Sequence, residues 1–175
     1  VSNLSSTRAL REITIKHGGQ YHASAVGEVN VVAKMKEVKA IIGGEGNGGV
    51  IFPDSHYGRD ALMGIGLFLS YYAQKNQKMS AIKASLPQFE MAKNKIELNP
   101  SIKVDELIAE MHTRYKDLEQ CNTVDGLKID FTDGWVHLRK SNTEPIIRVY
   151  SEAETAEKAD QLASRFVEEL KSMIT

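Results

Sequence analysis

Residues 128–150 have the sequence KIDFTDGWVHLRKSNTEPIIRVY, which is typical of an antiparallel β-sheet. Apolar and polar residues alternate on both sides of Asp133-Gly134, and this pattern predicts a β-hairpin with a two-residue turn. A further strand is predicted from Ile146 to Tyr150. The alternating apolar residues of the hairpin are Ile129, Phe131, Val136 and Leu138.

Helical patterns flank these strands. Apolar residues recur at helical spacing from Val104 to Leu118, and again in a last helix that begins at about Thr155. Residues 95–98 are predicted to form another strand. The second half is therefore expected to be an α+β domain with an antiparallel sheet and packed helices. The apolar face of the last helix comprises Ala159, Leu162, Phe166, Leu170 and Met173.

In the first half, short apolar runs alternate with helical patterns. Apolar residues lie on both sides of a glycine cluster at residues 43–49, and a helix capped by Asp60 is predicted to follow it. That helix contains ALMGIGLFLSYYA, residues 61–73, and is apolar on nearly all sides, which predicts that it is buried. The first half is expected to be an α/β domain with three layers and a mixed sheet.

The chain is predicted to divide into two domains. Residues 75–87 are polar, contain few large apolar residues and end in a proline, as a connecting helix or a linker between domains does. We expect domains over residues 1–79 and 88–175, joined by a linker at residues 80–87. Residues 1–87 carry a formal charge of +4 and the remainder −5, which is a weak sign of two different surfaces.

Composition excludes several classes of protein. The 175 residues include 22 Lys or Arg and 23 Asp or Glu, which gives a formal net charge of −1. The chain therefore lacks the overall excess of positive charge that binds nucleic acid or an anionic membrane. The single cysteine, Cys121, cannot form an internal disulfide, which favours the cytoplasm. The longest apolar stretch, residues 61–73, is shorter than the ~20 residues of a membrane-spanning helix. Neither nucleic acid nor a membrane is expected as a partner.

The connection between the predicted strands, residues 139–148, has the chemistry of a phosphate site. Two guanidiniums, two hydroxyls and an amide surround a short loop, and forked donors with backbone N–H groups suit a phosphate dianion. Glu144 opposes an anion, so we expect it to point away and to pair with an arginine. A solvated hairpin with incidental arginines is the alternative. The candidate phosphate ligands are Arg139, Ser141, Asn142, Thr143 and Arg148.

The glycine cluster GGEGNGG at residues 43–49 is the candidate sugar site. Glycines let the backbone approach a ligand closely, and a carboxylate and an amide supply the acceptors and donor that hydroxyl groups need. No Lys-Ser/Thr pair follows, so the cluster is not a nucleotide-binding phosphate loop. A plain connecting loop, in which glycine satisfies positive φ angles, is the alternative. The candidate sugar contacts are Glu45, Gly46, Asn47 and Gly48.

No pattern indicates a catalytic residue or a metal site in this chain. The five histidines lack the spacing of zinc ligands, no serine lies in a nucleophile motif, and the aspartates do not cluster as they do around Mg²⁺. His112 and His137 are expected to be ordinary surface residues.

At its two loops the sequence resembles the α-D-phosphohexomutase family, which includes phosphoglucomutase, phosphomannomutase and phosphoglucosamine mutase. Residues 43–49 are similar to the sugar-recognition loop of that family (G-E-x-S-G), and residues 139–148 to its phosphate-binding loop (R-x-S-N/G-T-x-P). Residues 5–8 (SSTR) and 26–28 (VGE) also fall where its third domain has similar segments. The resemblance covers nearly the whole chain and implies the third and fourth of four domains, with the first element of the third missing.

The resemblance implies roles for individual residues. Glu45 and Asn47 are expected to bind sugar hydroxyls, with Arg8 and Glu28 near the sugar, and the loop at residues 139–148 is expected to bind the substrate phosphate. The phosphoserine loop and the Mg²⁺ loop of the family belong to its first two domains and have no counterpart here. Asn47 stands where the family commonly has Ser, so the identity of the hexose stays open.

The chain is therefore expected to be the C-terminal fragment of an isomerase that interconverts hexose 1-phosphate and hexose 6-phosphate through a bisphosphate. Its expected partners are a hexose phosphate and the missing N-terminal half. Mg²⁺ is expected only for the intact enzyme, and this chain alone is expected to be inactive, with no catalytic residue and no metal ligand. A stand-alone sugar-phosphate-binding or regulatory module without catalysis is the alternative.

Overall fold

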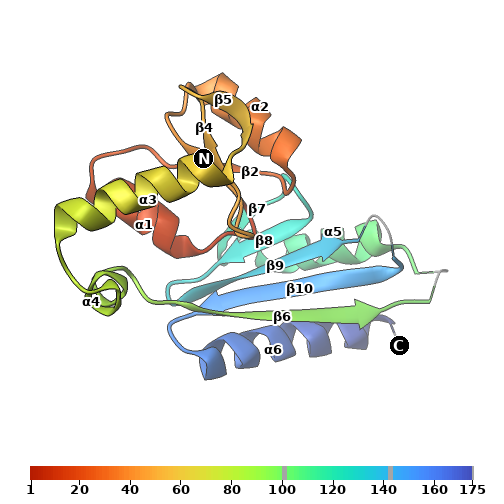
Figure 1. Cartoon of the computed structure of the whole chain (residues 1–175). Helices are drawn as coiled ribbons and strands as arrows, with labels where there is room; N and C mark the ends of the chain where they lie inside the picture. The colour runs from red at the N-terminus through yellow and green to blue at the C-terminus, as the bar shows by residue number, and fades with distance from the viewer. Residues whose placement is uncertain (100–101, 142–143, 175) are drawn as a thin grey trace. The chain divides into compact units, whose positions relative to one another are not determined.

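The computed structural model describes residues 1–99, 102–141 and 144–174 (Figure 1). The chain forms two compact units, Val1–Gln88 and Phe89–Thr175. Each unit has its own five-stranded sheet and its own buried hydrophobic cluster.

The strands of the first unit are β1 (Ser2–Asn3), β2 (Ala23–Ser24), β3 (Gly43–Gly44), β4 (Val50–Phe52) and β5 (His56–Arg59). Its helices are α1 (Arg8–Lys16), α2 (Glu28–Val38), α3 (Ala61–Lys75) and α4 (Met79–Ala84). The strand order is β2-β1-β3-β4-β5; β1 is parallel to β2 and β3, whereas β4 is antiparallel to β3 and β5. The predicted α/β class with a mixed sheet is confirmed.

The core of the first unit lies between α2 and the sheet. Val31 and Met35 on α2 and Ile51 on β4 are fully buried. Gly43 on β3 permits this close approach, because a Cβ atom there would overlap the sulfur atom of Met35. The helix and the sheet are therefore in contact where β3 has no side chain.

Helix α3 is capped as predicted, but it is not buried. Oδ1 of Asp60 accepts a hydrogen bond from the backbone N–H of Met63 at 2.9 Å. Gly64 faces β4, where an added Cβ would lie 3.1 Å from Cγ2 of Val50. No residue of α3 is buried, so the prediction of a buried helix is wrong. The reason is that the first unit covers only the side of α3 that faces β4. The next helix, α4 (Met79–Ala84), begins at the last residue of the predicted first domain and overlaps the predicted linker at residues 80–84.

The strands of the second unit are β6 (Glu90–Glu97), β7 (Gln120–Asn122), β8 (Leu127–Asp130), β9 (Gly134–Lys140) and β10 (Ile146–Ala153). Its helices are α5 (Val104–Tyr115) and α6 (Ala156–Ile174). All pairs in the strand order β6-β10-β9-β8-β7 are antiparallel. The predicted antiparallel sheet with packed helices is confirmed.

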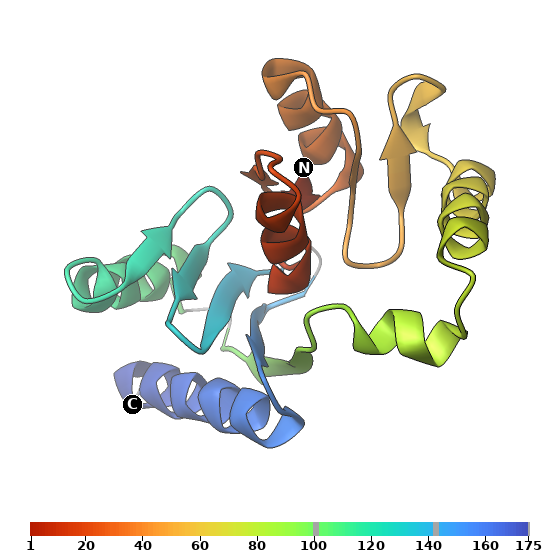
Figure 2. The same cartoon turned by 90° about the vertical axis from the view of Figure 1, so that its left-hand side faces the viewer.

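The second unit has a large core on one face of its sheet. Helices α5 and α6 lie along this face (Figures 1 and 2), and their apolar residues form one buried cluster with residues of β6, β8, β9 and β10. The predicted apolar face of α6 is correct, since Ala159, Phe166 and Leu170 are fully buried. The rings of Tyr115 and Phe166 lie 5.2 Å apart and extend this core between the two helices.

The hairpin between β8 and β9 turns one residue earlier than predicted. The backbone N–H of Phe131 donates to the carbonyl O of Gly134 at 2.9 Å, so Thr132 and Asp133 are the central residues of the turn. Gly134 begins β9, where a Cβ atom would overlap the carbonyl O of Glu152 on β10. Glycine is needed here for a close approach of two strands, and this contact between distant residues is absent from the local pattern.

Candidate functional site

Three loops of the first unit meet at the carboxyl ends of its parallel strands β1, β2 and β3. Glu45, which follows β3, joins them. Its Oε1 accepts hydrogen bonds from Nδ2 of Asn3 on β1 and from the backbone N–H of Gly27 after β2, both at 3.0 Å. Ligands bind at this edge of the sheet in open α/β folds. The edge collects three segments selected from the sequence, residues 5–8, 26–28 and 43–49.

The loop that carries Glu45 is a tight turn with an exposed tip. The N–H of Gly48 donates to the carbonyl O of Glu45 at 3.1 Å, and Oδ1 of Asn47 accepts from the N–H of Gly49 at 3.1 Å. Gly48 has a φ of 92°, which explains the glycine at this position. The tip, Gly46 to Gly48, is exposed, whereas Glu45 is half-buried. The amide nitrogen of Asn47 and the backbone of the tip are therefore accessible to a ligand.

The carboxylate of Glu45 is oriented before any ligand binds. Its Oε1 holds the neighbouring loops, while its Oε2 accepts no hydrogen bond from the described residues. Gly27 is the N-cap of α2, so the positive end of the helix dipole lies beside the carboxylate and stabilises its charge. An oriented, charged acceptor of this kind suits a hydroxyl donor.

Glu28 is held by an arginine that the sequence analysis missed. Its Oε2 pairs with Nε of Arg59 at 2.7 Å, and its Oε1 accepts from the backbone N–H of Arg59 at 3.3 Å. Both residues line a hollow of about 490 Å³, to which Gly48 and Gly49 of the glycine loop also contribute. Arg59 ends β5 and lies far from Glu28 in the sequence, so no local pattern could have indicated this pair.

Arg8 lies near the same edge, at the start of α1. Next to it, Oδ1 of Asn3 accepts hydrogen bonds from the N–H of Ser5 at 3.1 Å and from Oγ of Ser6 at 3.0 Å, which orders the loop after β1. Arg8 is only 8% exposed. It is therefore a weaker candidate for contact with a sugar than Glu45.

In the second unit, Arg139 on β9 and Arg148 on β10 are directly opposite each other in the antiparallel register. Residues paired in this way have Cβ atoms about 5 Å apart and side chains on the same face. Lys95 on β6, which the sequence analysis missed, is the partner of Arg148 on its other side. Ser141 is buried, and its backbone N–H donates to Ile146 at 3.1 Å. Asn142 and Thr143 lie outside the described residues.

Each of the two arginines has a carboxylate nearby. Oε2 of Glu144 lies 3.5 Å from a guanidinium nitrogen of Arg148, so the predicted pairing of Glu144 with an arginine is confirmed. Oδ2 of Asp125 lies 3.7 Å from a guanidinium nitrogen of Arg139. The Asp125-Gly126 dipeptide marks a turn before β8, but it does not indicate this contact.

His137 lies inside the protein, so its predicted place on the surface is wrong. It is 1% exposed, and its Nε2 lies 2.6 Å from the carbonyl O of Asp125. Burial lowers the pKa of His137 from 6.5 to about 4, although the backbone of Asp125 and its carboxylate oppose this shift. Alternation along β9 correctly turns His137 away from the core, but the loop that contains Asp125 contacts it there.

The part of the chain that the structure describes has neither a cluster of metal-binding side chains nor a membrane-spanning helix. Among these residues, no group of three or more His, Cys, Asp and Glu is placed to hold a metal ion. In the same ranges, no helix combines the length and the apolar character that crossing a membrane requires.

Comparison with known families gives one match for each unit. Residues 1–89 match "Phosphoglucomutase/phosphomannomutase, alpha/beta/alpha domain III", and residues 91–169 match "Phosphoglucomutase/phosphomannomutase, C-terminal domain". The class of protein is therefore that of the phosphohexomutases, as the two loops indicate. This chain belongs to the phosphoglucomutase/phosphomannomutase family and comprises its domain III and C-terminal domain.

Individual relatives agree with this assignment. A phosphoglucomutase/phosphomannomutase of Thermococcus kodakarensis is 37% identical over 162 residues, which cover 91% of this chain and 35% of that protein. A crystal structure of a family protein from Burkholderia thailandensis has a TM-score of 0.77 and 27% identity, and covers 98% of this chain and 36% of that one.

A more distant structure shows the fold alone. It is an N-acetylphosphoglucosamine mutase of Aspergillus fumigatus in complex with GlcNAc-6P and magnesium, with a TM-score of 0.60 at 15% identity. The match covers 94% of this chain and 40% of that one. This chain therefore spans between a third and two fifths of the length of these three relatives.

Proposed function

We propose that this chain is the substrate-holding part of a phosphohexomutase, which interconverts hexose 1-phosphate and hexose 6-phosphate. The observation that carries the proposal is the direct pairing of Arg139 with Arg148 in a C-terminal domain of the mutase family. Two adjacent guanidiniums supply the forked donors that bind a phosphate dianion. Ser141 and the predicted ligands Asn142 and Thr143 belong to the same loop and complete the proposed set.

In this proposal the glycine loop of the first unit holds the sugar. Oε2 of Glu45 accepts from hydroxyl groups, Asn47 adds an amide, and Gly46 and Gly48 let the backbone come close to the ring. A bisphosphate intermediate presents the sugar in two orientations in turn, and a carboxylate with an amide can serve hydroxyl groups in either. Glu28 and Arg8 border this loop and limit the space around the sugar.

The phosphoryl donor and the Mg²⁺ ligands belong, in this proposal, to the part of the mutase that the chain does not span. The proposal therefore assigns no step of this chain to Mg²⁺; among the described residues, no group of three or more His, Cys, Asp and Glu is placed to hold a metal ion. Positioning and charge neutralisation account for much of the catalysis of phosphoryl transfer, and this chain contributes both. The relatives carry the names of different hexose phosphate mutases, so the proposal extends to hexose phosphates as a class.

The test is binding of glucose 1,6-bisphosphate to the purified chain, measured by isothermal titration calorimetry and by ³¹P NMR. Loss of a charge-assisted hydrogen bond costs ~1.5–3 kcal/mol, so Arg139→Ala is expected to weaken binding by at least about tenfold. Arg114→Ala is the matched control, because Arg114 is an exposed residue of α5 that pairs with Glu110. Equal affinity of the wild type and Arg139→Ala would contradict the phosphate site.

Turnover measurements test the division of labour. The chain alone is expected not to convert glucose 1-phosphate to glucose 6-phosphate. Turnover by the purified chain would show that it contains the phosphoryl donor and would refute a purely substrate-holding role. A stand-alone binding module also predicts binding without turnover, but it predicts no gain of activity when the rest of a mutase is supplied.

A further inference from the structure

Asn47, in the glycine loop, is the only one of the eight asparagines in the chain that is followed by a glycine. Asparagine is thermolabile because the backbone nitrogen of the next residue can attack its side-chain amide. A side chain on that next residue hinders the attack, and glycine has none. Nothing lies within 4 Å of the place that a Cβ atom of Gly48 would take. The Asn47-Gly48 dipeptide therefore presents an unhindered nitrogen to the amide.

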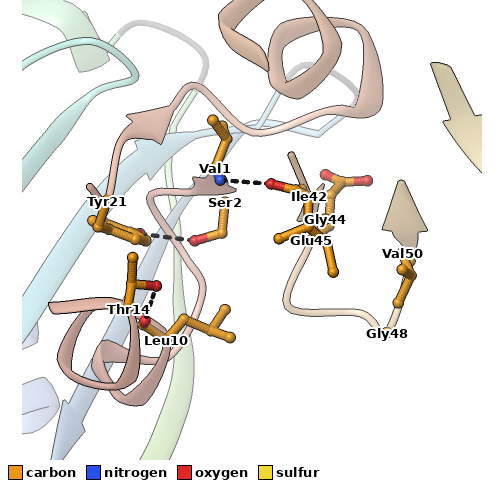
Figure 3. Close-up of a pocket in the computed structure, with 12 residues that line it drawn as sticks. Val1, Ser2, Leu10, Thr14, Tyr21, Ile42, Gly44, Glu45, Gly48 and Val50 are labelled. Atoms are coloured by element: carbon orange, nitrogen blue, oxygen red, sulfur yellow. Dashed lines mark hydrogen bonds between the residues drawn. The ribbon is translucent and has the colours of Figure 1, made fainter. Parts of the chain in front are cut away.

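The dipeptide lies at the tip of the glycine loop, where water reaches it. Residues 46–48 are all exposed, and Figure 3 shows Gly48 at the turn of the loop between Glu45 and Val50. Gly48 also lines two hollows, of about 240 Å³ and about 490 Å³. Its N–H donates to the carbonyl O of Glu45 at 3.1 Å, and a single hydrogen bond of an exposed turn is readily exchanged for one to water. A small local opening is therefore enough to free the nitrogen of Gly48.

The side-chain amide of Asn47 is held beside the backbone that follows it. Its Oδ1 accepts a hydrogen bond from the N–H of Gly49 at 3.1 Å. This bond keeps the side chain folded back over the next two residues and draws electron density away from Cγ, the carbon that is attacked. Gly46, Gly48 and Gly49 surround the amide without side chains that could shield it. The loop thus supplies both an accessible nitrogen and an oriented carbonyl group.

We propose that Asn47 is a site of spontaneous deamidation, and that this modification weakens the sugar site of the proposed function. The backbone nitrogen of Gly48 forms a bond to Cγ of Asn47, and the bond between Cγ and Nδ2 breaks. The leaving amide group takes up the proton of the attacking N–H and departs as ammonia. Water then opens the five-membered imide and leaves aspartate or isoaspartate at residue 47. The net reaction consumes one water and releases one ammonia, without an oxidant or a reductant.

The modification changes the atom of Asn47 that is accessible to a ligand. Because Oδ1 is held by Gly49, the accessible atom is the amide nitrogen, and this nitrogen is replaced by an oxygen. A hydrogen-bond donor for sugar hydroxyls is thereby exchanged for a charged acceptor, two residues from the carboxylate of Glu45. The formal net charge of the chain changes from −1 to −2. This consequence rests on the proposed function, whereas the chemical change does not.

The experiment incubates the purified wild-type chain in mildly alkaline buffer and samples it over time. Trypsin releases residues 40–59 as one peptide, in which Asn47 is the only asparagine and no glutamine occurs. Tandem mass spectrometry is expected to show a gain of about 1 Da at residue 47. The gain is expected to be at least about tenfold faster than at Asn30 and Asn76, which are exposed but are followed by larger residues. It is also expected to accelerate with pH, because the attacking nitrogen must lose its proton.

Binding of glucose 1,6-bisphosphate to the same samples, measured by calorimetry, tests the consequence for the sugar site. Affinity is expected to fall about two- to tenfold as residue 47 is converted, as the loss of one hydrogen bond does. Asn47→Asp is expected to have the reduced affinity before incubation. Asn47→Gln is expected to keep its initial affinity throughout, because its longer side chain would have to close a larger ring. Asn76→Gln is the matched control and is expected to lose affinity at the wild-type rate.

The two readouts separate the modification from the proposed function. No gain of mass at residue 47, or a rate equal to that at Asn76, would overturn the proposal. Conversion of residue 47 with unchanged affinity would overturn its consequence, and with it the role of Asn47 as a sugar contact. If the wild-type chain did not bind glucose 1,6-bisphosphate before incubation, the proposed function would be contradicted, and the mass measurement would still decide whether Asn47 is modified.

Discussion

Arg139 and Arg148 lie opposite each other on β9 and β10, and each has a carboxylate within ion-pair distance. Like charges in this position repel one another. Asp125 and Glu144 offset that repulsion in the free protein, and a bound phosphate would do so in their place. The two carboxylates therefore compete with the proposed ligand for the same guanidiniums.

This competition predicts the effect of Glu144→Gln. Removal of the negative charge beside Arg148 is expected to tighten binding of inorganic phosphate about two- to fivefold, the range of a partly exposed ion pair. The gain is expected to shrink as salt is added, because exposed charges are screened. Calorimetric titration of the chain measures it. Glu110→Gln removes the same charge from α5 and is expected to leave phosphate affinity unchanged; weaker binding in Glu144→Gln would contradict the competition.

His137 predicts how stability depends on pH. Its pKa is about 4 in the folded state and 6.5 in an unfolded chain, so the unfolded state binds more protons between these values. The free energy of unfolding therefore rises with pH across this window. The stability that depends on a neutral His137 is fully present above about pH 6.5 and is lost progressively as the pH falls toward 4. Between pH 6.5 and 4.5 the expected loss is about 2–3 kcal/mol.

Urea unfolding followed by the fluorescence of Trp135, the only tryptophan, measures this effect in the second unit. His137→Gln keeps a side-chain N–H donor but does not titrate, and it is expected to flatten the pH dependence. His112→Gln is the control that is expected to keep it. Equal pH slopes in the wild type and His137→Gln would show that other groups cause the loss.

At the scale of single elements, the approach of β9 to β10 depends on a glycine. A Cβ atom at Gly134 would overlap the carbonyl O of Glu152. Gly134→Ala is therefore expected to destabilise the second unit by about 1–3 kcal/mol, as overpacking does, measured by urea unfolding with Trp135 fluorescence.

A glycine substitution in α3, Gly66→Ala, is the comparison for Gly134→Ala. Nothing lies within 4 Å of a Cβ atom at Gly66, so Gly66→Ala is expected to stabilise that helix by about 0.5–1 kcal/mol, measured by circular dichroism. If Gly134→Ala left the free energy of unfolding unchanged, β9 and β10 could move apart at this point without loss of stability. That result would remove the structural explanation for this glycine.

At the scale of the whole molecule, the two units differ in how much core they have. Amides of β9, β10 and α6, which belong to the large cluster, are expected to exchange with solvent far more slowly than those of α1 and α3. Native-state hydrogen exchange of the chain, read by mass spectrometry, measures the difference. Equal protection of α3 and α6 would contradict the inference that the small core of the first unit leaves α3 less stable than α6.

Much of the fold was predictable because its signals are local. The apolar stripes of α5 and α6, the strand at residues 146–150 and the cap at Asp60 all follow from spacing within a few residues. The predictions failed where a distant residue decides the outcome. Gly134 meets Glu152, and His137 meets Asp125, through pairings that no short window of sequence contains.

The amino-acid sequence by itself determined the class of each half, the two candidate loops and the family resemblance. Residue chemistry and short-range periodicity suffice for these. Only the tertiary structure decided that Arg139 and Arg148 face each other, that Glu45 joins three loops, and that α3 lies exposed. Strand register and crossover connections bring together residues that are far apart in the chain, and burial depends on whether another element covers a surface. Neither property is encoded in the neighbourhood of a single residue.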